Sequence, residues 1–276
     1  MADELPDEFI EKIRTAVKRV GPEKFLLGEV WEDATTKYGF NQRRTYLLGK
    51  GLDSVMNYPF KNAVLDFVKG KPAEQAANEI LTICEHYPAP AIDTALNFLS
   101  THDTERALTV IADEPANGRG RQWQSGRCVT GDAYEEGLLR LRMAYAIIYT
   151  LPGVPCLYYG DEIAMQGYRD PFNRAFFRWD AHEQRLRPVL AQLAQLRHTC
   201  EAFRTGKLWV LRAEGGILHY QRIGEVETAE IIVNRTEHII VETLASGKST
   251  EVNPMGFTIV VEEVGHNPNH SYYDYV

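Results

Sequence analysis

Up to about Phe203, short apolar runs alternate with longer stretches that have the hydrophobic spacing of a helix. The first such stretch begins near Pro6, keeps apolar residues on one face as far as Val20, and ends at Gly21. The apolar runs that we expect to form strands are 24–31, 54–60, 97–103 and 154–159. The further helices that we expect are 62–86, 134–150 and a last one through 186–196, capped by Asp180. This order predicts four β-then-α units whose strands lie parallel in one sheet.

The pattern changes after about Phe203. Short apolar runs now recur about every ten residues, with turn residues between them: 208–211, 217–220, 231–233, 239–241 and 258–261. This spacing is typical of a small all-β domain. We therefore expect two domains, residues 1–203 and residues 204–276, the second of them a β-sandwich.

The length of the first domain limits the folds that it can adopt. Four β-then-α units are half of an eight-unit barrel, and a complete barrel usually takes ~250 residues. We therefore expect the second half of a TIM (β/α)8 barrel (strands 5–8), followed by the small all-β sandwich domain. A half barrel exposes two strand edges and an apolar interior, so we expect it to dimerise, to aggregate or to recruit the missing half. Self-association through those edges is the hypothesis that we take forward.

Charge and composition exclude several classes of protein. The chain has 30 basic and 38 acidic side chains and a net charge of −8, which argues against a nucleic-acid-binding surface. No apolar run approaches the ~20 residues that cross a membrane. Its four cysteines are far apart and form no metal-binding pair, so we expect reduced thiols and a cytoplasmic location. There is no Asp-rich calcium loop, so we expect no metal and no cofactor.

Candidate chemistry lies where the expected strands end, which is where barrel enzymes carry their catalytic groups. Glu29 stands there beside Trp31, and Asp103 stands there beside His102. A glutamate among apolar neighbours has its neutral form favoured and can protonate a leaving oxygen. An ionised aspartate can hold sugar hydroxyl groups through charge-assisted hydrogen bonds. Spacing alone leaves open the alternative that either carboxylate is an ordinary polar residue of a surface loop.

Three segments that occur in a fixed order are more specific. They are Leu-Gly-Glu-Val-Trp (27–31), Asn-Phe-Leu-Ser-Thr-His-Asp-Thr-Glu-Arg (97–106) and Leu-Pro-Gly-Val-Pro-Cys-Leu-Tyr-Tyr-Gly-Asp-Glu (151–162). Together they resemble glycoside hydrolase family 13, the α-amylase family. Asp-Pro-Phe-Asn-Arg (170–174) and Phe-Phe-Arg-Trp (176–179) are similar to its neopullulanase, cyclomaltodextrinase and maltogenic amylase branch. The resemblance covers nearly the whole chain.

The resemblance implies a role for several residues. Glu29 matches the family's general acid/base, and Asp103 matches the carboxylate that stabilises the transition state. With Asp103, His102 would hold hydroxyl groups of the sugar in the −1 subsite. Trp31 would lie near the sugar on the leaving-group side, with a core indole as the alternative. Two arginines are candidates for substrate contact, with a loop or surface role as the alternative: Arg106 and Arg174.

The resemblance also implies that one catalytic group is missing. A retaining glycosidase needs a second carboxylate about 5 Å from the acid, as the nucleophile. In the family this Asp ends the fourth strand, shortly before a segment similar to residues 1–9. We therefore expect this chain to start after the nucleophile, with Asp3 at the helix entrance and not a substitute for it.

The expected function is that of a retaining α-glucan hydrolase, here truncated and inactive alone. Its partner would be an oligosaccharide or polysaccharide substrate: maltooligosaccharides, cyclodextrins or pullulan, cleaved at α-1,4 linkages, with α-1,6 linkages as a further option. The alternative is a non-catalytic glucan-binding fragment or an inactive partial gene product.

Overall fold

The computed structural model describes residues 1–264 and 271–275. Four two-residue strands pair in parallel, β1 (Leu27–Gly28) with β4 (Ser54–Val55) and β5 (Leu96–Asn97) with β6 (Val154–Pro155). A parallel bridge from Met56 to Leu96 joins the two pairs, so the four strands stand in chain order. Parallel strands place their carboxyl ends at one edge, where functional side chains can gather.

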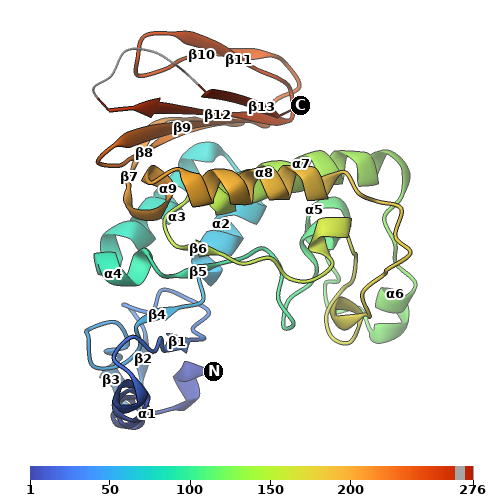
Figure 1. The fold of residues 1–276 in the computed structure, drawn as a ribbon. Coiled ribbons are helices and arrows are strands. Elements are labelled where there is room, and N and C mark those ends of the chain that lie inside the picture. The colour runs from blue at the N-terminus through green and yellow to red at the C-terminus, as the bar shows by residue number, and fades with distance from the viewer. Residues whose placement is uncertain (265–270, 276) are drawn as a thin grey trace.

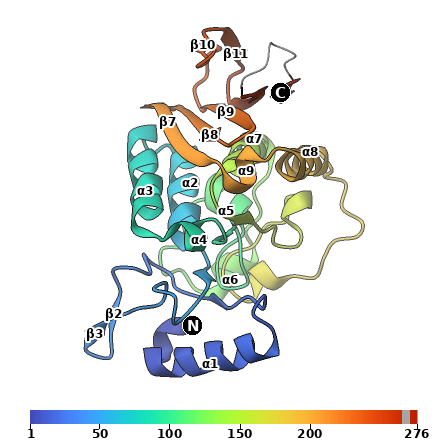
Figure 2. The same cartoon turned by 60° about the vertical axis from the view of Figure 1, so that its left-hand side comes forward.

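Most of the helices lie between these strands and the C-terminal sheet (Figure 1). The helices are α1 (Asp7–Val20), α2 (Tyr58–Lys69), α3 (Ala73–His86), α4 (Ala89–Ile92), α5 (Ala107–Ala112), α6 (Arg121–Ser125), α7 (Gly131–Thr150), α8 (Leu186–Thr199) and α9 (Ala202–Thr205). Helix α7 packs against α2, α5 and α8 and is buried along most of its C-terminal half. Helix α1 lies at the opposite end of the molecule from the C-terminal sheet (Figure 2). Within the part of the chain that the structure describes, no helix has the length and apolarity needed to cross a bilayer.

The C-terminal region forms an antiparallel sheet in the order β13-β12-β9-β8-β7. Its strands are β7 (Lys207–Glu214), β8 (Ile217–Ile223), β9 (Glu227–Asn234), β12 (Gly256–Glu263) and β13 (Ser271–Tyr275). Alternate residues of β9 face opposite sides, as strand geometry requires. Ile231 and Val233 belong to the main core beneath the sheet, whereas Ile232 packs in a second cluster with residues of a hairpin above it. That hairpin consists of β10 (Ile240–Thr243) and β11 (Ser249–Val252).

Several elements differ from the sequence prediction. The expected helix over 62–86 is two helices, because Gly70 adopts φ 137° and ends α2, and Pro72 precedes α3. The last helix begins at Leu186, with Arg185 and not Asp180 at its N-terminal cap position. The four strands expected before Phe203 are only two residues long. The sequence prediction missed β2 (Tyr38–Gly39), β3 (Gln42–Arg43), β11 and β13. The amphipathic helices α1 and α7 and the parallel pairing are confirmed.

Candidate active site

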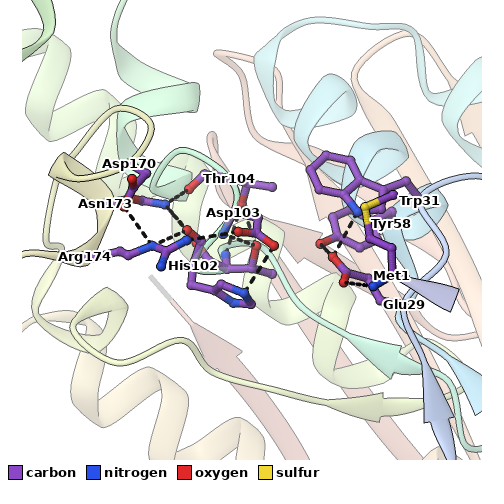
Figure 3. A network of polar contacts seen from close by, with 11 residues as sticks. Met1, Glu29, Trp31, Tyr58, His102, Asp103, Thr104, Asp170, Asn173 and Arg174 are labelled. Atoms are coloured by element: carbon purple, nitrogen blue, oxygen red, sulfur yellow. Dashed lines mark hydrogen bonds and ion pairs between the residues drawn. The ribbon is translucent and has the colours of Figure 1, made fainter. Parts of the chain in front are cut away.

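Glu29 directly follows β1 and is held by two ring systems. Its Oε1 accepts hydrogen bonds from Trp31 Nε1 at 3.0 Å and from the Tyr58 hydroxyl at 3.3 Å (Figure 3). Its Oε2 lies 3.7 Å from the amino group of Met1. The side chain is 21% exposed. The two donors fix one oxygen of the carboxyl group, whereas the other faces the amino group of Met1.

Trp31 and Tyr58 form an aromatic wall beside this carboxylate. Their rings stack at 4.4 Å and 13°, and Phe98 packs edge-on against Tyr58 at 4.9 Å. Burial, with the nearby charges of Glu29 and Asp103, raises the pKa of Tyr58 to about 12. The phenol therefore keeps its proton at neutral pH and stays a donor to Glu29.

Local sequence positions Tyr58 at the start of α2. The Asn57 side chain caps the helix by accepting from the Phe60 amide at 3.2 Å, and Pro59 stands in the first turn. Asn57 also donates from Nδ2 to Asn97 Oδ1 at 3.0 Å, which ties the end of β4 to the end of β5. The sequence prediction placed residue 58 in a strand and so missed this contact with Glu29, although an asparagine two residues before a proline is a helix-start signal.

Asp103 lies in the loop after β5, with a side-chain partner for each carboxylate oxygen. Its Oδ1 accepts from Arg174 Nη2 at 3.1 Å, and its Oδ2 lies 3.2 Å from His102 Nε2. Arg174 also donates from Nε to the His102 carbonyl at 2.9 Å. The Asp103 side chain is 33% exposed. The structure thus brings three of the predicted site residues into one cluster.

A buried residue that the sequence prediction missed holds this loop in place. Asn173 donates from Nδ2 to the carbonyls of His102 at 2.7 Å and Thr104 at 2.8 Å, and more weakly to that of Thr101 (Figure 3). Its neighbour Arg174 holds the Asp103 carboxylate. The only sequence signal was the 170–174 segment itself, which carried a family resemblance but no indication of this contact.

Arg106 lies inside the protein and not beside a substrate. Its side chain is 0% exposed. It donates from Nε to the Asn173 carbonyl at 2.9 Å and pairs through Nη1 with Asp161 at 3.1 Å. The guanidinium also covers the rings of Tyr158 and Tyr159. This burial does not support the substrate contact expected for Arg106, and it indicates instead that Arg106 fixes the loop carrying Asn173.

Other candidate groups are engaged elsewhere. Asp3 accepts from the Tyr46 hydroxyl at 2.6 Å and pairs with Lys37 at 3.0 Å, so its carboxylate belongs to a separate network. In residues 1–264 and 271–275, no three His, Cys, Asp or Glu side chains are grouped to hold a metal ion.

Carboxylates that follow two strands of one parallel sheet, one beside an indole and one between an arginine and a histidine, are typical of a glycosidase of the βα-barrel class. Residues 4–217 match the family described as the alpha amylase catalytic domain. The chain therefore belongs to the α-amylase family, as its motifs predicted.

Individual relatives agree with this assignment. The chain is 32% identical over 242 residues to a cyclomaltodextrinase of Geobacillus thermopakistaniensis (strain MAS1), covering 86% of this chain and 36% of that protein. It is 31% identical over 238 residues to an amylopullulanase of Thermoanaerobacter thermohydrosulfuricus, covering 80% of this chain and 15% of that protein. It thus spans well under half the length of either relative.

The fold is similar to that of solved members of the family. A cyclic alpha-maltosyl-(1→6)-maltose hydrolase from Arthrobacter globiformis superposes with a TM-score of 0.78 and 24% identity, over 94% of this chain and 54% of that one. At this identity the likeness concerns the fold.

Proposed function

We propose that this chain carries the general acid/base, Glu29, and the transition-state-stabilising carboxylate, Asp103, of a retaining α-glucan hydrolase. The observation that carries the proposal is that two carboxylates at one edge of the sheet are each held by two side chains. Trp31 and Tyr58 hold Glu29 at the end of β1, and Arg174 and His102 hold Asp103 after β5. The names of the relatives favour maltooligosaccharides, cyclodextrins or pullulan as substrates.

Each carboxylate has surroundings suited to its role. The donors on Oε1 of Glu29 leave Oε2 to give a proton to the leaving oxygen and later to take one from water. The Asp103 carboxylate, held by Arg174, can accept hydrogen bonds from two sugar hydroxyl groups. His102 is more than half exposed and adds a further hydrogen-bonding group at the same place.

The nucleophile is a separate part of the proposal. Retention requires a carboxylate about 5 Å from the acid. Asp3 is committed to Tyr46 and Lys37, and we do not assign it that role. We propose that the nucleophile comes from outside residues 1–276 and that this chain alone does not turn over substrate.

We also propose that residues 1–203 correspond to strands 5–8 of a barrel and residues 204–276 to its accessory β-domain. Among the described residues, β1 and β6 each pair on one side only, which leaves two edges open. Open edges favour association with another chain. Sedimentation should show a dimer or larger species, and a monomer at micromolar concentration would contradict self-association.

A cytoplasmic location is proposed from the cysteines. All four are free, and burial raises the pKa of the Cys84 and Cys200 thiols to about 12. Such thiols are inert and suit a reducing compartment. Fractionation of the source cells tests this, and recovery outside the cytoplasm would contradict it.

The test of function is sugar release from maltoheptaose and γ-cyclodextrin, paired with calorimetric titration of the same sugars. We expect binding without turnover by the chain alone. Turnover that disappears in Glu29→Gln and persists in Glu32→Gln, an exposed glutamate of the same loop, would show that a nucleophile is present after all. Neither binding nor turnover would contradict the proposal and favour an inactive gene product.

A further inference from the structure

A pocket of about 440 Å³ opens beside the candidate active site, between the start of α2 and the loop after β5. Trp31, Tyr58 and Asp103 form its inner wall, and Glu29 is not part of the lining. The outer wall adds side chains that the proposed chemistry does not use: Lys61, Asp66, Glu105 and Arg169. Its volume lies in the range of pockets that bind small ligands, which is about 300–1,000 Å³.

Lys61 is the unusual member of this lining. The residue is only 8% exposed, yet the hydrogen bond of its side chain is a long one, 3.5 Å from Nζ to Asn62 Oδ1. No ion pair within 4.0 Å includes it among the described residues. Lysine is rarely buried unless it is paired. Its amine therefore has N–H groups that can donate to a ligand in the pocket.

The position of Lys61 also disfavours a purely structural role. It stands near the N-terminal end of α2, where the helix dipole opposes a positive charge. Burial lowers the pKa of Lys61 to about 8, although Glu105 and Asp66 act in the other direction and Arg169 adds to the lowering. A buried cation held at such a position costs stability, and groups of this kind gather at functional sites.

The chemistry of the pocket selects the type of ligand. Two cations, Lys61 and Arg169, face three carboxylates, those of Asp66, Asp103 and Glu105, so the lining as a whole repels an anion. It offers both donors and acceptors at close range, which suits hydroxyl groups because each can donate and accept. Trp31 adds an aromatic surface that can pack on the apolar face of a sugar ring.

We propose that this pocket binds a neutral sugar ring of the glucan, and that Lys61 determines its affinity by donating a hydrogen bond to a hydroxyl group of that ring. This inference rests on the proposed function. It adds a specificity-determining residue that lies outside the predicted acid and stabiliser.

The experiment is calorimetric titration of maltoheptaose into full-length variants that all carry Glu29→Gln, so that no substrate is consumed. Lys61→Met keeps the length of the side chain and removes the charge, and Lys61→Arg keeps the charge and the donor. Lys69→Met, at an exposed position of the same helix, is the matched control. Each titration is made at pH 6.5 and pH 9.5, and each variant is also melted.

We expect Lys61→Met to bind about tenfold more weakly at pH 6.5, because a hydrogen bond from a charged donor is lost. With Lys61 present, affinity should fall severalfold at pH 9.5 as the amine loses its proton. Lys61→Arg should keep its affinity at both values, and Lys61→Met should show no such fall. The Tm of Lys61→Met should be equal to or higher than that of the parent, since an unpaired buried charge has been removed.

A purely structural lysine would give a different result: a lower Tm in Lys61→Met with unchanged affinity, which would overturn this inference and leave the proposed function standing. Loss of affinity in Lys69→Met equal to that in Lys61→Met would also overturn it. If the parent with Lys61 binds no maltoheptaose at either pH, the proposed function and this inference both fail.

Discussion

The indole of Trp31 and the phenol of Tyr58 stack at 4.4 Å, and both donate a hydrogen bond to the same oxygen of Glu29. The two rings come from different strand ends, one just after β1 and one just after β4. One contact therefore joins two neighbouring β-then-α units and orients the candidate acid.

Tyr58→Phe should keep this stack and remove one donor to Glu29. The free energy of unfolding should fall by about 1 kcal/mol, since one side-chain hydrogen bond is lost. Tyr58→Ala should cost about 3–5 kcal/mol because it also leaves a cavity. Urea denaturation measures both, with Tyr38→Phe, at an exposed position, as the control. Equal losses for Phe and Ala at position 58 would contradict the packing role of the ring.

Asn173→Ala should release the loop that carries Asp103. The substitution removes the Asn173 amide donor from the His102 and Thr104 carbonyls, of which only that of His102 keeps a second side-chain donor, Arg174, and a loss of about 2–3 kcal/mol is expected. Amide hydrogen exchange should become faster in residues 101–104. Asn78→Ala, at an exposed position of α3, should change neither quantity. Unchanged exchange in Asn173→Ala would show that the loop is held by other contacts.

The buried pair of Asp7 and Arg44 should make stability depend on pH. Burial alone raises the pKa of Asp7, but hydrogen bonds from Arg44 and Thr45 outweigh it and hold the pKa below its ordinary value of 3.8. The stabilisation is therefore present above about pH 4 and is lost as the pH falls through the lowered folded-state pKa.

Asp7→Asn should remove this pH dependence and cost about 3 kcal/mol at neutral pH, because Arg44 is left buried without its charged partner. Thermal melts between pH 2.5 and 7 measure both effects. Glu8→Gln, at an exposed position of the same helix, is the control. If stability falls at acid pH in Asp7→Asn as it does in the parent, Asp7 is not the group responsible for this pH dependence.

His219 should hold the β10–β11 hairpin to the large sheet. Its Nε2 lies 3.0 Å from Glu230 on β9, and its Nδ1 lies 3.4 Å from Glu242 on β10. His219→Phe leaves two buried carboxylates without this partner, and a loss of about 3 kcal/mol is expected. Differential scanning calorimetry measures it. His238→Phe, at an exposed position, should leave the Tm unchanged.

The regular parts of the fold could be predicted because their signals are local. The apolar stripe of α1 and the long buried face of α7 have helical spacing, and the short strands after Phe203 recur at even intervals. Strand length could not be predicted in this way. An apolar run indicates that a segment is buried. The length of a strand depends instead on how many of its residues pair with a neighbouring strand, and in the run over 24–31 only Leu27 and Gly28 do so.

The candidate site shows the same division. Glu29, Trp31, His102 and Asp103 stand in ordered motifs, and the structure places each near the carboxyl end of a strand. Asn173 and Lys61 could not be found, because their roles depend on contacts between loops that are distant in sequence. Arg106 stands in a motif, but its burial depends on how two later segments pack around it.

The adjacent residues Asn173 and Arg174 divide two tasks, since one anchors the backbone around Asp103 and the other supplies its positive partner. A single inserted residue upstream of this dipeptide would displace anchor and counter-ion together. Downstream, Phe176 and Trp179 are 96% and 91% exposed and are free of that constraint. Substitutions at these two positions should therefore leave the Asp103 carboxylate in place, whereas a change of chain length before Asn173 should move it.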